Sequence, residues 1–311
     1  MKKKYLWTWV GMAALLMGCN GAQTGNQSGE AKDSIVIEHK LGSSKVVEKP
    51  ARIVALDIGA VETLYELGVT PVGLSKKFVP DYLAEWKNNP DIGDIGSVIE
   101  PNFEAINSLQ PDVILMSTRQ ERFYDELNSI APAIFVGTEN ADYLTSFHKS
   151  TMLIAKIVGK EQEAEEKLKA LDAKIVAAQE KYKDNPNKFL LLLYNNGRFS
   201  SFGKGSRFGF IFDVLGLKPA LPYVEDSVHG QRVSNELIVE ANPDYIFIVD
   251  RNAAVLGKAA NKSEVENKLI QQTKAYKDGK IFYLNPDVWF ISGGGLTSVG
   301  LMVDDMEKIL K

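Results

Sequence analysis

Two stretches of the chain repeat one pattern of residues. They cover residues 104–119 and 236–251, and each reads as a short helix, a Pro-Asp turn and an apolar strand. An arginine closes each copy, Arg119 in the first and Arg251 in the second. Because a repeated unit of this kind usually marks a repeated half, we expect two similar lobes. Ligands of open α/β sheets bind beyond the carboxyl ends of the strands, so facing lobes would aim both arginines into one cleft. That arrangement indicates an anionic ligand.

The first residues have the pattern of an export signal. Three lysines precede an apolar run over 5–17, which is too short for a good membrane span. The run ends in Leu-Met-Gly-Cys, and Cys19 is the only cysteine, so a disulfide within the chain is impossible. Residues 1–18 resemble a bacterial lipoprotein signal peptide, which would leave Cys19 as the lipid-carrying first residue. An ordinary signal peptide, or an anchor helix with an incidental cysteine, is the alternative.

Composition separates a tether from the folded part. Residues 19–33 are rich in Gly, Gln, Asn and Ser and lack apolar periodicity, which predicts a flexible tether. The chain as a whole is 45% hydrophobic, enough for two packed cores, and its formal net charge is −4 without basic runs. This balance argues against nucleic acid as a partner. A positively charged site must therefore be local.

Strand and helix signals alternate through the rest of the chain, which predicts an α/β fold of two Rossmann-like lobes joined by a single long helix. The predicted domains are an N-terminal lobe (34–145), an inter-lobe helix (146–183) and a C-terminal lobe (184–311). The first lobe is predicted to contain a hairpin (35–37 with 45–47), strands at 52–56, 72–74 and 133–136, and helices at 60–67 and 120–131. The second is predicted to contain strands at 188–193, 198–202 and 280–284, and helices at 208–215, 263–276 (with Ser263 as N-cap) and 298–310.

The inter-lobe helix is indicated by one apolar stripe on a charged segment. Its members step by four and three residues, which is helical spacing: Ala164, Leu168, Leu171, Ile175 and Ala178. A coiled coil is the alternative, but the stripe is short for one. We expect one rigid helix that bridges the lobes.

Three arginines are candidates for a cationic cleft. Arg207, in a Gly-rich stretch at the entrance to a helix, joins Arg119 and Arg251. Arginine is always protonated and presents a planar fork of donors that suits polyoxygen anions. The alternative for each arginine is a private salt bridge, but the repeat that relates Arg119 and Arg251 favours a shared site.

Other residues give weaker signals. His229 lies in a polar loop, where it could ligate a transition metal or simply form hydrogen bonds. The run Gly293-Gly294-Gly295 lacks the spacing of a phosphate loop and fits a tight turn better. The sequence contains no nucleophile elbow, no paired nucleophile and base, and no Cys/His cluster with metal-ligand spacing. We therefore expect that the protein is not an enzyme.

Glu104 and Glu236 occupy equivalent positions in the two repeats, each in the first turn of a helix with Asn102 or Ser234 as N-cap. An acidic residue there is favourable to the helix dipole. The functional alternative is a pair of exposed docking residues, one on each lobe, for a partner with two-fold symmetry.

Several segments taken in order resemble one family of binding proteins. They include Asn102–Ile106, Pro111–Leu115, Ser117–Gln120, Ser206–Gly209, Asn242–Tyr245, Val249–Asn252 and Tyr283–Pro286. From residue 34 to the C-terminus the chain is similar to the periplasmic-type binding proteins of ABC importers for iron-siderophores and cobalamin. Within that cluster it most resembles the catecholate (enterobactin- and petrobactin-type) siderophore-binding lipoproteins.

This resemblance implies a class III periplasmic-binding-protein fold, two α/β lobes with one connecting helix. It implies that Arg119, Arg207 and Arg251 hold a triply negative ferric tris-catecholate, with Trp289 and Phe290 beside it. By the same resemblance His229 would ligate Fe(III), and Glu104 and Glu236 would meet basic residues of the two permease subunits.

The chain departs from the family at one position. Members that ligate iron directly carry a Trp-Tyr pair after the last strand, whereas this chain has Trp289-Phe290. Phenylalanine has no oxygen for iron. Either a hexadentate siderophore needs no protein ligand, or a neighbour such as Tyr223 substitutes.

The leading hypothesis is a substrate-binding lipoprotein that captures a ferric catecholate siderophore and delivers it to an ABC permease. We expect a monomer without a permanent cofactor, held by the lipid on Cys19 at the extracytoplasmic face of the cell membrane. Haem capture with His229 as axial ligand is the alternative binding function. A metal-dependent hydrolase of siderophore esters is the alternative from another class.

Overall fold

The computed structural model describes residues 33–221 and 230–311, so Cys19, Tyr223 and His229 lie outside the described residues. A β-hairpin comes first, formed by β1 (Ser34–His39) and β2 (Gly42–Val47). It precedes a parallel sheet of order β5-β4-β3-β6-β7. The strands of this sheet are β3 (Ile53–Ala55), β4 (Gly73–Leu74), β5 (Gly93–Asp94), β6 (Val113–Met116) and β7 (Ala133–Phe135).

The helices of this N-lobe connect and cover the parallel strands. They are α1 (Ile58–Glu66), α2 (Ala84–Asn88), α3 (Phe103–Ser108), α4 (Tyr124–Ile130) and α5 (Tyr143–Val158). A 3-10 turn, Thr118–Phe123, stands between β6 and α4, where the sequence predicted one continuous helix. The buried residues of this lobe gather on the two faces of the sheet, as expected for strands covered on both sides.

The C-lobe is built on a second, mixed sheet of order β11-β9-β8-β12-β13, with β10 paired to β8. Its strands are β8 (Lys188–Asn195), β9 (Arg198–Phe202), β10 (Lys218–Pro219), β11 (Gln231–Val233), β12 (Tyr245–Asp250) and β13 (Ile281–Leu284). Its helices are α7 (Phe210–Asp213), α8 (Asn235–Ala241), α9 (Arg251–Leu256), α10 (Lys262–Val265), α11 (Lys274–Lys277) and α12 (Leu296–Ile309). The predicted α/β fold of two lobes is confirmed, although β9 and β11 run antiparallel to their neighbours.

The sequence repeat corresponds to a structural repeat, α3–β6 in the N-lobe and α8–β12 in the C-lobe. Strand β6 lies in parallel between β3 and β7, and β12 lies in parallel between β8 and β13. The Pro-Asp turn has the same role in both. Asp112 Oδ2 accepts from the backbone N–H of Arg52 (2.9 Å), just before β3, and Asp244 Oδ2 accepts from that of Lys188 (2.7 Å), the first residue of β8. Each aspartate thereby connects the Pro-Asp turn to the start of the neighbouring strand.

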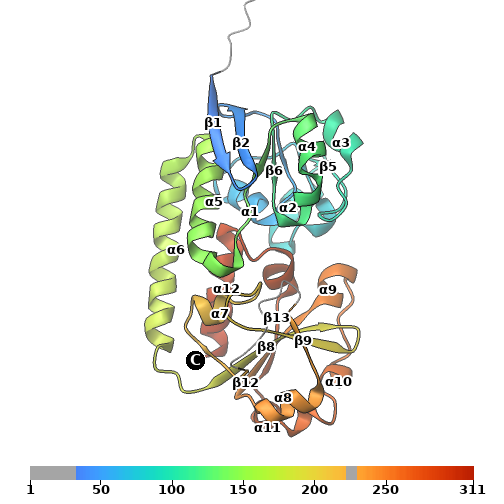
Figure 1. The fold of residues 1–311 in the computed structure, drawn as a ribbon, viewed down its shortest axis with the longest axis vertical. Coiled ribbons are helices and arrows are strands. Elements are labelled where there is room, and N and C mark those ends of the chain that lie inside the picture. Colours follow the sequence, from blue (N-terminus) through green and yellow to red (C-terminus); the bar gives the residue numbers. More distant parts are fainter. Residues whose placement is uncertain (1–32, 222–229) are drawn as a thin grey trace, which may run out of the picture. The chain divides into compact units, whose positions relative to one another are not determined.

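Helix α6 (Glu161–Tyr182) bridges the lobes through its apolar stripe. Ala164 packs into the N-lobe core, whereas Leu168, Leu171, Ile175 and Ala178 pack into the C-lobe core. The helix contacts α5 of the N-lobe and α12 of the C-lobe (Figure 1). Gly159, at φ 68°, ends α5 and separates the two helices. The predicted bridging helix is present as α6, but it begins at Glu161 and not at residue 146, because residues 146–158 belong to α5. The domain boundaries themselves stay predictions.

The predicted helix over 263–276 is wrong. Three short elements occupy this segment: α10, a 3-10 turn at Ile270–Gln272 and α11. Asn261, not Ser263, caps α10 by accepting from Ser263 N–H, and the Asn267 amide oxygen accepts from Leu269 N–H (3.0 Å). Side chains of this type compete with the helix for backbone donors and so divide the segment.

Candidate ligand-binding cleft

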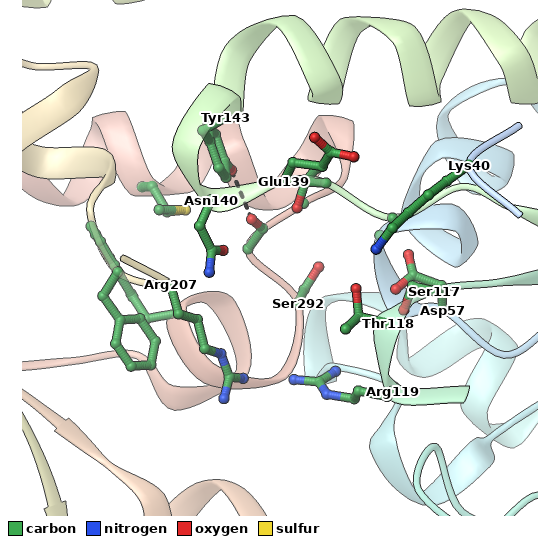
Figure 2. Close-up of a pocket in the computed structure, with 18 residues that line it drawn as sticks. Lys40, Asp57, Ser117, Thr118, Arg119, Glu139, Asn140, Tyr143, Arg207 and Ser292 are labelled. Atoms are coloured by element: carbon green, nitrogen blue, oxygen red, sulfur yellow. Dashed lines mark hydrogen bonds between the residues drawn. The ribbon is translucent and has the colours of Figure 1, made fainter. Parts of the chain in front are cut away.

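A cavity of about 390 Å³ lies between the carboxyl ends of the N-lobe strands and the C-lobe (Figure 2). Its N-lobe wall comes from the loops that follow three neighbouring strands: Asp57 after β3, Ser117–Arg119 after β6 and Gly137–Asn140 after β7. Its C-lobe wall includes Arg207, Phe208, Trp289 and Ser292–Gly294. This is where open parallel sheets bind ligands.

Arg119 is fixed by the turn that follows β6. The Gln120 side chain is buried; its oxygen accepts from Ser117 N–H (3.0 Å), and its amide nitrogen donates to the Val98 carbonyl. The Arg119 guanidinium crosses to the other lobe, where Nη1 donates to Ile291 O (3.0 Å) and Nη2 donates to Phe290 O (3.0 Å). Burial lowers the pKa of Arg119, and the carboxylate of Asp57 opposes that shift.

Arg207 approaches the Phe290 carbonyl from the C-lobe. The turn before it is fixed because Ser206 Oγ donates to Gly203 O (2.6 Å) and Asp213 Oδ2 accepts from Gly205 N–H (2.7 Å). Its Nη2 donates to Phe290 O, and its Cζ lies 4.3 Å from the centre of the Phe290 ring. Burial first, and then the charges of Arg119 and Arg251, lower the pKa of Arg207 to about 9. The group remains protonated at neutral pH.

Arg251 completes the cationic group. It is the first residue of α9, after β12, and its half-buried side chain is close enough for its charge to act on Arg207. It does not line the cavity itself. Within residues 33–221 and 230–311, none of the three arginines forms a salt bridge. The structure thus brings together the three arginines that the sequence singled out.

The Trp289-Phe290 pair belongs to a π-helical turn, Asp287–Ile291. Trp289 lines the cavity, but only 2% of its surface is exposed, since Nε1 donates to Asp305 Oδ2 (2.9 Å) and the ring packs edge-on against Phe210. Phe290 does not line the cavity itself; its carbonyl accepts from Arg119, and its half-buried ring packs against the Arg207 guanidinium. Such turns are rare and occur often at functional sites.

Sequence reasoning missed several residues of the cavity wall. Thr118 and Asn140 follow the carboxyl ends of β6 and β7, a position that could have identified them. Tyr143 donates its hydroxyl to Gly293 O (2.7 Å), and Lys40 enters from the β1–β2 hairpin (Figure 2). No local pattern distinguishes these two, because only the tertiary fold brings their segments to the cavity.

A buried carboxylate lies behind the cavity, where α1 meets α12. Glu62 has no exposed surface; it accepts from the Tyr82 hydroxyl and, at 2.8 Å, from Ser298 N–H. Burial raises the pKa of Glu62, and hydrogen bonds from Ser292, Tyr82 and Ser298 oppose that rise. One turn later, Glu66 accepts from Thr297 Oγ1 (2.9 Å) and pairs with Lys167 (2.7 Å). These contacts tie the N-terminal end of α12 to the N-lobe.

The two candidate docking glutamates are exposed. Glu104 and Glu236 lie in the first turns of α3 and α8, whose predicted N-caps, Asn102 and Ser234, accept from Ala105 N–H and Leu237 N–H. Hydrogen bonds from its own backbone N–H and from Ser234 lower the pKa of Glu236. Their role in docking stays a prediction.

The described part of the chain holds no group of three or more His, Cys, Asp or Glu side chains arranged to bind a metal ion. Among the helices in residues 33–221 and 230–311, none has both the length and the apolar character needed to span a bilayer.

Comparisons with known proteins agree with this architecture. The chain is 39% identical over 279 residues to the ferric-anguibactin-binding protein FatB of Vibrio anguillarum, covering 88% of this chain and 87% of FatB. It is 34% identical over 304 residues to the petrobactin-binding protein YclQ of Bacillus subtilis, covering 96% of each. The crystal structure of YclQ superposes with a TM-score of 0.87 over 90% of this chain and 99% of that chain.

A further solved structure shows a relative with its ligand. The siderophore-binding protein BauB, bound to two molecules of acinetobactin and ferric iron, is 35% identical and superposes with a TM-score of 0.84, over 90% of this chain and 99% of BauB. The family model for periplasmic binding proteins, which bind substrates and are not enzymes, matches residues 53–288. This chain belongs to the periplasmic binding protein family.

Proposed function

We propose that this protein captures a ferric siderophore with catecholate groups and delivers it to the permease of an ABC importer. The observation that carries the proposal is that Arg119 and Arg207, one from each lobe, line one cavity, and that the charge of Arg251 acts on Arg207. The names of FatB, YclQ and BauB, which refer to siderophores, support it.

The electrostatics of the cleft fit a multiply charged anion. Three like charges in a partly desolvated site repel one another, and the pKa of Arg207 is lowered by burial first and then by that repulsion. A ferric tris-catecholate carries three negative charges, so it would neutralise the cluster. Arginine donors form their strongest hydrogen bonds with oxyanions, which catecholate oxygens provide.

The iron itself would take most or all of its oxygen ligands from the siderophore. Phe290 occupies the position of the family tyrosine and has no oxygen to offer. His229 is the candidate for a direct protein ligand, and Tyr223 is the candidate substitute for the missing tyrosine. His229→Ala and Tyr223→Phe test these two candidates. Each variant should alter the charge-transfer absorption of the bound complex only if the replaced residue ligates iron.

The location and partners complete the proposal. The protein would act as a monomer outside the cytoplasm, anchored to the cell membrane by a lipid on Cys19. Glu104 and Glu236, exposed on the first turns of equivalent helices, would contact basic residues of the two permease subunits. Double replacement by Ala should abolish iron uptake while leaving siderophore binding intact.

Tryptophan fluorescence provides the direct test. Trp289 lines the cavity, whereas Trp86 is buried in the N-lobe core. A bound ferric catecholate should therefore quench emission, and Trp289→Phe should remove most of the quenching without preventing binding measured by calorimetry. The proposal fails if no ferric catecholate quenches or binds at micromolar concentration. A Soret band with hemin that is lost in His229→Ala would instead support haem capture.

A further inference from the structure

Lys40 is a cation of the cleft that belongs neither to the repeat nor to the arginine cluster. It follows β1 at the tip of the first hairpin and lines the cavity. Figure 2 shows its side chain extending toward Asp57 and Ser117, on a different side of the cavity from Arg207. The cavity therefore has a positive group on its N-lobe wall, contributed by an element outside the parallel sheet.

The hairpin tip is held at the cavity rim by His39. Its Nδ1 accepts from the backbone N–H groups of Leu41 (3.3 Å) and Phe135 (3.4 Å), and its Nε2 is 3.2 Å from Ser44 Oγ. Because backbone N–H groups only donate, Nδ1 is unprotonated, and burial lowers the pKa of His39, which favours this neutral form. Phe135 is the last residue of β7, so the contact joins the hairpin to the strand that leads into the cavity wall.

The amine of Lys40 is only weakly engaged. Nζ lies 3.3 Å from Glu121 Oε2, and the two side chains are 42% and 36% exposed. It also lies 4.9 Å from the centre of the Phe135 ring. Exposed ion pairs of this kind are weak, so a ligand oxygen could replace Glu121 at little loss. Arg119 differs, because two backbone carbonyls already fix its donors.

We propose that Lys40 is a further ligand-contacting residue, which binds an anionic oxygen of the siderophore on the N-lobe side of the cleft. This inference rests on the proposed function. A compact trianion that fills the cavity would contact Arg207 on the C-lobe wall, and Arg119 and Lys40 at two separate places on the N-lobe wall. Lys40 would thereby favour one kind of complex, in which negative charge is distributed around the whole surface of the ferric siderophore. Complexes that carry their charge on one side alone would bind less tightly.

The test compares three variants of the full chain with a hexadentate ferric tris-catecholate of charge −3 as the probe. Lys40→Met keeps the aliphatic stem and removes the charge, Lys40→Arg keeps the charge, and Lys45→Met removes an exposed lysine of β2 that lies outside the cavity wall. Lys40→Met should weaken binding about tenfold to a hundredfold, the range for one hydrogen bond to a charged group. Lys40→Arg should retain most of the affinity, and Lys45→Met should match the wild type.

A fourth variant separates ligand contact from a structural role. Glu121→Gln removes the charged partner of Lys40 but leaves the positive charge of Lys40 in place, so the siderophore should bind equally well or more tightly. The inference is overturned if Glu121→Gln weakens binding as much as Lys40→Met does, or if Lys40→Met equals Lys45→Met. In both cases the wild type still binds, and the proposed function stands. Failure of the wild type to bind the probe overturns both.

Discussion

At the scale of single residues, Arg207 combines a cost in stability with a gain in binding. Its guanidinium is buried beside two other arginines, which lowers its pKa to about 9. Within residues 33–221 and 230–311, the carbonyl to which it donates, that of Phe290, is already shared with Arg119. Buried charges without a charged partner destabilise the folded state, whereas the same charges bind an incoming anion strongly. Stability and affinity should therefore respond to Arg207 in opposite directions.

Arg207→Met tests this opposition, since Met preserves the packing of the stem on Phe290. The ligand-free variant should be as stable as the wild type or more stable, because Met carries no desolvation penalty of a buried charge; replacement of buried ion pairs by apolar residues is often stabilising by about 1–4 kcal/mol. Its affinity for a ferric tris-catecholate should fall by about 2–5 kcal/mol. Thermal unfolding and calorimetric titration measure the two effects. A less stable variant with unchanged affinity would show that Arg207 serves the fold instead.

Residues differ in how far the sequence reveals them. The repeat identified Arg119 and Arg251, and capping rules identified Asn102 and Ser234, because each signal lies within a few neighbouring positions. Lys40 and Glu62 gave no such signal. The surroundings of Lys40 depend on β7, and those of Glu62 depend on α12, and both elements are remote in the chain. Only the folded structure therefore shows that Lys40 lines a cavity and that Glu62 is fully buried.

At the scale of elements, helical periodicity was informative where a helix packs on one face. The stripe of α6 is buried as predicted, because a bridging helix must cover both cores with the same side. Residues 262–277 lacked that constraint, and the side chains of Asn261, Asn267 and Thr273 start separate turns there. Local hydrogen bonds between these side chains and the backbone therefore divide the segment into short turns instead of one helix.

The start of α1 depends on a glycine for its close approach to the C-lobe. A Cβ built on Gly59 would lie 2.7 Å from both the carbonyl carbon and the oxygen of Gly294, a backbone contact that cannot move aside. Gly300, within α12, is a matched control, because its Cβ would find its nearest neighbour, Leu171 Cδ1, at 3.8 Å.

Gly59→Ala should lower the free energy of unfolding by about 1–3 kcal/mol, the usual result of overpacking. Gly300→Ala should be neutral or stabilising by about 0.5–1 kcal/mol, since Ala favours the helix. Urea unfolding of both variants measures the difference. Equal effects would mean that the α1 contact with Gly294 is not a constraint on the fold.

At the scale of the whole molecule, the lobes are joined both by α6 and by polar contacts between α1 and α12. Glu62 and Glu66, one turn apart on α1, accept from Ser298 N–H and Thr297 Oγ1 at the start of α12. The loop before α12 carries Ser292–Gly294, which line the cavity. The carboxylate of Glu62 thus supports the cavity wall from behind.

Because burial raises the pKa of Glu62, this junction makes stability depend on pH. The unfolded carboxyl loses its proton near its ordinary pKa of 4.5, whereas the folded one keeps it to higher pH. In the window from 4.5 up to the raised pKa, the folded state binds more protons, so the free energy of unfolding contributed by Glu62 falls as pH rises. Glu62→Gln has no proton to lose and should flatten the profile there. Urea unfolding at a series of pH values measures both slopes. Parallel profiles for the wild type and Glu62→Gln would show that Glu62 is ionised throughout the window, with its three donors outweighing the effect of burial.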